Sequence, residues 1–167
     1  MQEFDTKKLY VFFWNFTRKD IEKLCSIDLS FASNTQENEM ISYPQDKFDF
    51  IEYLVDDETQ KHNCLDIPKK ANSNAINVVE NFVKSGKKQI ILTNYPAFIS
   101  SLLAQVAYGQ LRANEIEIRY DKKQISKYYI RRKQEGNKIE AYFVDENDKK
   151  VIFDSSVIPY TNNDPNF

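Results

Sequence analysis

The chain has 167 residues, of which 41% are hydrophobic and 29% charged, and its formal net charge is −2. This composition is typical of a globular protein and excludes a disordered chain, and the length predicts one domain. The slightly acidic balance argues against a protein that wraps duplex nucleic acid. The sequence contains no apolar run of ~20 residues and no recognisable signal peptide, so we expect a cytoplasmic protein without membrane contact.

The scarcity of glycine, histidine and cysteine excludes several catalytic designs. Three glycines, each placed where an element should end, exclude a Walker loop and a dinucleotide fingerprint. One histidine, His62, with Cys25 and Cys64 far from each other in the chain, does not form a zinc motif or a nucleophile-histidine pair. We expect both cysteines to be reduced and structural. We therefore expect no metal and no cofactor, and we name no catalytic residue.

The first element is a strand followed by a polar turn and a helix. Residues 9–14 form a near-continuous apolar run, which predicts a buried strand. Asn15 and Phe16 make the turn, and Thr17 is placed to cap a helix over 18–26. Acidic residues in the first turn of this helix match its dipole.

From residue 27 to residue 60 the pattern is weaker. Alternation predicts short strands at 29–32 and 40–43, and residues 48–54 suggest a short helix or an edge strand. Residues 56–63 indicate a solvated loop or a helix end. A further helix is expected to begin at Ser73 or Asn74 and to end at Gly86.

A second strand, turn and helix follow, and the chain is organised around them. Residues 89–92 predict a strand buried on both faces, as in a parallel sheet. The turn at 93–95 leads to Pro96, which suits the first position of a helix that we expect to run to 108 and to end at Gly109. Both turns would lie at the carboxyl ends of their strands, facing each other across a topological switch point.

The C-terminal third is expected to be richer in strands. Residues 115–120 alternate as in a strand with one wet face, and 125–132 with 138–145 indicate an antiparallel hairpin around Gly136. A short strand is predicted at 151–153, which completes a hairpin extension over about 124–154 before a loose tail at 161–167. The predicted fold is a single α/β domain over 1–167, with a Rossmann-like, mainly parallel sheet flanked by helices and a C-terminal antiparallel β-hairpin extension.

The two turns supply the candidate ligand-binding residues. Helix N-termini and a guanidinium suit phosphates, and aromatic rings suit bases, so the inventory favours a phosphodiester ligand. The alternative is that these turns bind nothing and that Trp14 and Phe16 belong to the core. Small residues on the helix 97–108 would let it pack closely on the sheet or on its own copy in a dimer. The candidates are Asn15, Phe16, Thr17, Arg18, Thr93, Asn94, Tyr95 and Ser100.

Two stretches of this sequence resemble a known family. The strand at 9–13 followed by a Thr-capped helix, and the run from Gln89 through Thr93-Asn94-Tyr95-Pro96 to Leu111, are similar to small stand-alone CARF-like proteins of type III CRISPR systems. The resemblance implies a homodimer that binds a cyclic oligoadenylate, with cyclic tetra-adenylate expected, as a sensor or sponge or as a ring nuclease. The resemblance implies that any cleavage needs no metal and proceeds by in-line attack of a ribose 2′-OH. The position of His62 outside both turns argues against a histidine-dependent ring nuclease, and without an evident general base the rate is expected to be slow.

Two other functions stay open on the sequence. On the predicted hairpin, basic side chains lie on both sides of Tyr128 and Tyr129, as on a surface for single-stranded nucleic acid; they are Lys127, Arg131, Arg132 and Lys133. The same charges could instead protect an exposed strand from edge pairing. An immunity or inhibitor type of interaction protein would use the Tyr-rich hairpin and the acidic residues 56–58 on a protein partner.

Overall fold

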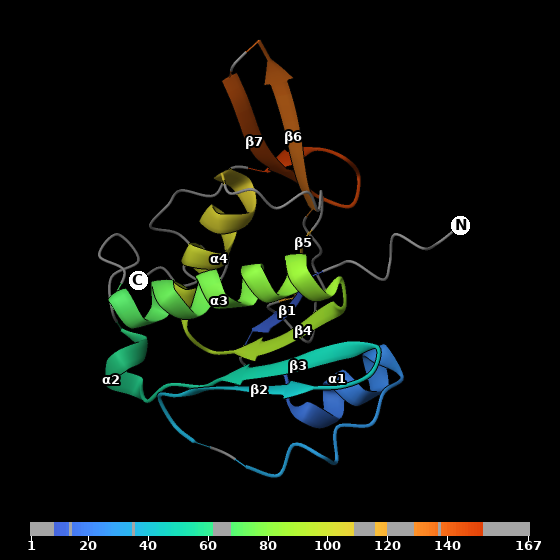
Figure 1. Ribbon diagram of the computed structural model, residues 1–167, viewed down its shortest axis with the longest axis vertical. Coiled ribbons are helices and arrows are strands. Elements are labelled where there is room, and N and C mark those ends of the chain that lie inside the picture. The colour runs from blue at the N-terminus through green and yellow to red at the C-terminus, as the bar shows by residue number, and fades with distance from the viewer. Residues whose placement is uncertain are drawn as a thin grey trace.

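The computed structural model describes residues 9–13, 15–34, 36–61, 68–108, 116–119, 129–136 and 138–151. It is an α/β fold whose larger sheet has five strands in the order β2-β3-β4-β1-β5, flanked by helices (Figure 1). All neighbours in this sheet pair in parallel except β2 and β3, which are antiparallel. The strands are β1 (Leu9–Phe13), β2 (Met40–Pro44), β3 (Phe48–Tyr53), β4 (Lys88–Thr93) and β5 (Ile116–Arg119), and the helices are α1 (Arg18–Cys25), α2 (Asp57–Gln60), α3 (Lys69–Ser85) and α4 (Pro96–Tyr108).

Two hydrophobic clusters occupy the two faces of this sheet. Alternate residues of a strand point to opposite faces, so Val11 and Ile91 pack with α3 and α4, whereas Phe12 and Ile90 pack with α1 and the segment after it. Figure 1 shows α3 and α4 together on one side of the sheet and α1 on the other. One face is therefore covered by 17- and 13-residue helices, and the other by one helix of eight residues.

A second, smaller sheet joins β6 (Tyr129–Glu135), β7 (Lys138–Val144) and β8 (Lys150–Val151) in antiparallel order. The predictions for residues 152–167, including the loose tail, lie outside the described residues. Of the helices that are described, none has the length and apolarity required to cross a bilayer.

The elements around the two turns are confirmed. Strand β1 and helix α1 occupy the predicted residues, and Thr17 caps α1 in a reciprocal capping box with Asp20. Strand β4 lies between two parallel strands, as its uninterrupted apolar run predicts. Pro96 is the first residue of α4, and Gly86 ends α3 at φ 67°. Gly109 lies outside the described residues.

The predicted strand at 29–32 is wrong. This segment forms turns, in which the Ala32 N–H donates to the Leu29 carbonyl and the Ser30 N–H to the Asp28 carboxylate. The Leu29 N–H donates to the Glu22 carboxylate of α1 at 2.7 Å. Because these partners satisfy the backbone locally, the segment needs no sheet neighbour, and it still buries Leu29 and Ala32 against the sheet.

Four further features differ from the predictions. Residues 48–53 form an internal strand rather than a helix or an edge strand, because β2 covers the outer edge of β3. Helix α3 begins at Lys69, one turn before the expected caps, and residues 57–60 form the short helix α2. The polar face of β5 is not wet, since Glu117 is only 4% exposed.

Candidate functional site

The carboxyl edge of the sheet contains a topological switch point between β1 and β4. These strands are neighbours, and their last residues, Phe13 and Thr93, are register partners. The chain leaves β1 towards α1 on one face and leaves β4 towards α4 on the other (Figure 1). The two predicted turns therefore begin side by side, which is the arrangement that opens a crevice for ligands in α/β sheets.

Arg18 is held by four hydrogen bonds at this edge. Its Nε and Nη2 bind the two carboxylate oxygens of Glu52 at 2.7 and 2.6 Å. Nη2 also donates to the Asn34 carbonyl at 2.9 Å, and Nη1 donates to the Ala32 carbonyl. The hydrogen bond with Glu52 raises the pKa of Arg18. The guanidinium is 28% exposed while Glu52 is 4% exposed, so Arg18 neutralises a buried carboxylate and ties the 29–34 segment to β3.

The residues before Arg18 serve the helix end. Thr17 Oγ1 accepts from the Asp20 N–H at 3.2 Å, and the Thr17 N–H donates to the Asp20 carboxylate at 2.8 Å. Phe16 is 5% exposed and packs edge-on against Phe12, so it belongs to the core, as the alternative interpretation held. Asn15 is exposed and adopts φ 93°, and its side chain lies at the surface beside the α1 N-terminus.

The second turn is bound to the end of β3. Thr93 Oγ1 donates to the Tyr53 carbonyl at 2.7 Å and accepts from the Tyr95 N–H at 3.1 Å. The Asn94 carboxamide pairs with both the N–H and the carbonyl of Val55, at 2.8 and 2.9 Å. Tyr95 is 2% exposed, with its ring edge-on to that of Tyr53. These side chains extend the pairing of β4 with β3 beyond the last strand residue.

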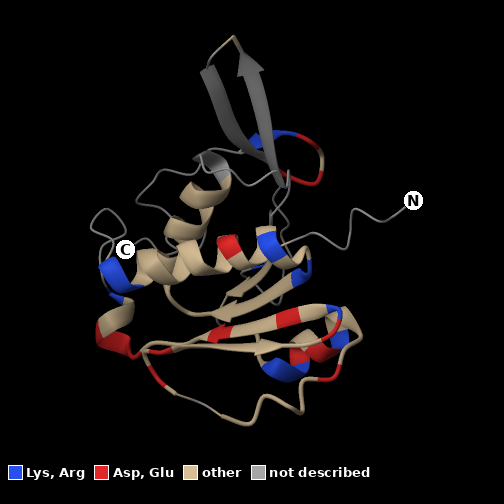
Figure 2. Cartoon of the chain, viewed as in Figure 1, with Lys and Arg blue, Asp and Glu red and all other residues tan. Residues whose placement is uncertain are grey.

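Ser100 is partly exposed on α4, and its neighbour Ser101 is buried. Ser101 Oγ lies 2.5 Å from Asn72 Oδ1, so this small residue lets α4 approach α3. The described part of α4 contains no charged residue, whereas α1 carries both signs (Figure 2). The charged side chains that could pair with a ligand at the switch point therefore belong to α1.

The groups that this edge can offer an anion are mostly backbone amides. The capping box uses the N–H groups of Thr17 and Asp20, which leaves those of Arg18 and Lys19 in the first turn of α1. At α4, Pro96 has no N–H, and the next residue, Ala97, is buried. The α1 N-terminus, with Asn15 beside it, is thus the part of the predicted site that remains open to a phosphate.

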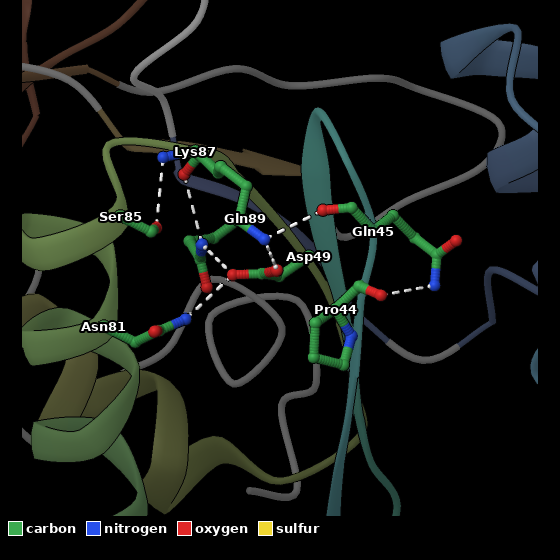
Figure 3. A network of polar contacts seen from close by, with 7 residues as sticks. All are labelled: Pro44, Gln45, Asp49, Asn81, Ser85, Lys87 and Gln89. Atoms are coloured by element: carbon green, nitrogen blue, oxygen red, sulfur yellow. Dashed lines mark hydrogen bonds and ion pairs between the residues drawn. The ribbon is translucent and has the colours of Figure 1, made fainter.

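A polar cluster at the opposite end of β3 and β4 was missed by the sequence analysis (Figure 3). The Asp49 carboxylate is 1% exposed and lies 2.8 Å from Lys87 Nζ. It also accepts hydrogen bonds from Asn81 and Gln89, both at 2.8 Å. Burial raises the pKa of Asp49, but the hydrogen bonds and charge of its partners outweigh this and lower it. These three partners hold the Asp49 carboxylate in place, so the cluster joins β3 to β4 through Gln89 and to α3 through Asn81.

The alternative functional surfaces lie mainly outside the described residues. His62, Cys64, Trp14, Lys127 and Tyr128 are among the residues not described, and so are the side chains of Arg131, Arg132 and Lys133. Within the acidic stretch, Asp56 caps α2 by accepting from the Thr59 N–H at 2.7 Å. Among the described residues, no three His, Cys, Asp or Glu side chains are grouped as a metal site.

Neither a family model, nor a curated protein, nor a solved structure was found that matches this chain.

Proposed function

We propose that this protein binds a cyclic oligoadenylate at the carboxyl edge of its sheet and acts as a sensor or sponge in type III CRISPR antiviral signalling. The observation that supports the proposal is the switch point between β1 and β4, where both turns begin at register partners. The Rossmann-like (CARF-like) identity of the fold and the homodimer belong to the same proposal and rest on the sequence resemblance, whereas the hairpin extension rests on the alternating pattern of residues 125–145.

The α1 side of the edge would make the first contacts with phosphate. The N–H groups of Arg18 and Lys19 point out of the positive end of a helix, and such ends bind anions. The Asn15 side chain can add a hydrogen bond from the turn. The Arg18 guanidinium has five N–H groups and uses four hydrogen bonds internally, so one N–H is left for a ligand oxygen.

Cleavage, if it accompanies binding, would follow from positioning alone. The ribose 2′-OH would attack its own phosphate in line, and the amides of α1 would stabilise the charge that develops on the phosphoryl oxygens. No general base has been assigned to the reaction, so turnover is expected to be slow. Chromatography of the ligand after a long incubation with enzyme would separate the intact ring from linear products.

Calorimetric titration with cyclic tetra-adenylate tests the proposal directly. Asn15→Asp places a negative charge where the phosphate is expected, at a residue whose positive φ Asp also tolerates, and should weaken binding about tenfold or more. Asn77→Asp makes the same chemical change at an exposed position of α3 and should leave binding unchanged. Light scattering with and without ligand measures the dimer.

Three results would refute the proposal. The first is the absence of heat at tens of micromolar ligand, a concentration at which a micromolar site is saturated. The second is equal binding of linear tetra-adenylate, which would favour a single-strand binding surface. The third is equal weakening by Asn15→Asp and Asn77→Asp, which would place the ligand away from the switch point.

A further inference from the structure

A cavity of about 740 Å³ lies on the α1 face of the sheet, at the end opposite the switch point. Its floor includes Tyr10 of β1 and Ile90 of β4, and its walls include Phe48 at the start of β3 and Cys25 at the end of α1. Cavities of roughly 300 to 1,000 Å³ with a mainly apolar lining are the usual size for small-molecule sites.

The cavity exists because α1 covers only part of this face. A helix of eight residues is about 12 Å long. Near the carboxyl edge, Phe12, Phe50 and Leu92 are all at most 3% exposed beneath it and the segment that follows. Nearer the amino ends of the strands, Tyr10 and Phe48 are only partly buried, and both line the cavity.

The charges around this surface do not cancel. Glu117 and Arg119 of β5 form an ion pair at 3.0 Å, and Asp46 lines the cavity beside Lys47. Lys47 and Lys88 form no ion pair with a carboxylate of the described residues, and Lys88 Nζ lies 5.5 Å from the centre of the Tyr10 ring. Within the described chain, Arg119 Nε is also buried without an acceptor. Lys88 and Arg119 would both gain from an added acceptor.

We propose that this cavity binds a small organic anion with a flat apolar body, whose carboxylate or phosphate group pairs with Lys88. The ring or hydrocarbon part lies against Tyr10 and Phe48, which are partly exposed, and displaces water from them. Because the cavity and the switch point lie at opposite ends of the parallel strands, this site stands independently of the proposed cyclic oligoadenylate site.

Cys25 provides a local reporter for occupancy. It lines the cavity, and burial raises the pKa of its thiol, with the nearby charges of Arg119 and Lys88 opposing part of this shift. A molecule bound beside Lys88 should therefore shield this thiol. The measurement is the rate at which iodoacetamide alkylates Cys25, with the modified peptide identified by mass spectrometry so that Cys64 does not contribute.

Three probes separate the charge from the ring. Phenyl phosphate carries both, benzyl alcohol carries only the ring, and inorganic phosphate carries only the charge. At about 1 mM, a concentration that occupies weak small-ligand sites, phenyl phosphate should slow alkylation of Cys25 about fivefold. The other two probes should have little effect. An unchanged rate with phenyl phosphate would overturn the proposal, and so would equal protection by benzyl alcohol or by inorganic phosphate.

The variants assign the effect to Lys88. Lys88→Met should abolish protection by phenyl phosphate, and Lys88→Arg should retain it because the charge is kept. Lys84→Met, at an exposed position of α3, removes the same charge elsewhere and should leave protection intact. Thermal melts establish that each variant is folded. Protection that survives Lys88→Met in a folded protein, or that is lost equally in Lys84→Met, would overturn the assignment.

Discussion

The ion pair between Arg18 and Glu52 gives the sharpest test of how this edge is built. Glu52 is 4% exposed, and both of its carboxylate oxygens accept from Arg18. Removing one partner of a buried pair costs about 3–5 kcal/mol, because the other charge stays behind without compensation. Arg18 is 28% exposed, so water recovers part of this loss, and we expect Arg18→Met to lower the free energy of unfolding by about 2–4 kcal/mol.

The double variant isolates the pair itself. Arg18→Met with Glu52→Met replaces both charges by apolar side chains and should be more stable than Arg18→Met alone, since no buried carboxylate is left unpaired. Urea unfolding monitored by circular dichroism measures Arg18→Met, Glu52→Met and the double variant against the wild type. A loss below about 0.5 kcal/mol in Arg18→Met, the range of ordinary surface changes, would refute the buried-pair reasoning. So would a double variant less stable than either single variant.

The same pair connects stability to the proposed ligand. Glu52→Gln removes the competing charge, so the Arg18 guanidinium is freer to meet a phosphate, and binding of cyclic tetra-adenylate should become tighter while the fold becomes less stable. If Arg18 has only a structural role, Glu52→Gln should lower stability and leave the affinity unchanged. Calorimetry and urea unfolding on one preparation distinguish these two outcomes.

Four other substitutions test separate features. The pKa of Asp49 is lowered in the folded protein, so as the pH falls through the ordinary value of 3.8 the unfolded chain takes up the proton first. The stability that this carboxylate contributes is therefore present above that pH and lost below it. Asp49→Asn should reduce the fall in the urea midpoint between neutral and acid pH. Thr93→Val should cost about 1–3 kcal/mol in urea unfolding, because two buried hydrogen bonds are lost, against less than about 0.5 kcal/mol for Ser100→Ala. Phe98→Ala, at 0% exposure, should cost about 3–5 kcal/mol and lower the melting temperature accordingly. Ser26→Gly should raise stability by about 0.5–1 kcal/mol, since the residue that ends α1 has φ 55°; an unchanged melting temperature would contradict this.

The centre of the fold was predictable because its signals are local. In both β1–α1 and β4–α4, an apolar run of strand length, a residue suited to a helix start and a helical repeat lie within a few residues of one another; the residue is the cap Thr17 in the first and Pro96 in the second. The mostly parallel sheet follows, since such strands must be buried on both faces. Thr17 and Asp20 form their capping box inside one helical turn, so the sequence contains the whole interaction.

The errors arose where the deciding partner is distant in sequence. Strand β3 contains Asp49 and Glu52, which look unsuitable for an internal strand. Their partners, Lys87 and Arg18, are 38 and 34 positions away, so nothing near β3 indicates that the charges will be neutralised. Charged residues placed singly in an otherwise apolar run are the one available sign that such partners exist.

The site residues show the same limit. The sequence identified Thr93 and Asn94 as polar groups at the end of a strand, and that is where they lie. It could not show that the Thr93 hydroxyl and the Asn94 carboxamide bind the backbone of residues 53 and 55. A polar side chain after a strand can serve a ligand or the neighbouring backbone equally well, and only the register of β3 against β4 decides which.

The two ends of the parallel strands therefore differ in what they leave for a ligand. At the carboxyl edge, most side chains satisfy one another and the backbone, so a phosphate must rely on the amides of Arg18 and Lys19, on the turn at Asn15 and on the one unused N–H of the Arg18 guanidinium. At the amino end, on the α1 face, Lys88 lies over Tyr10 without a carboxylate partner among the described residues, beside an open cavity. A ligand at the carboxyl edge would depend mostly on backbone geometry. Its binding should tolerate most side-chain changes except added negative charge. A ligand at the amino end would depend on one cation, so a single substitution should remove it.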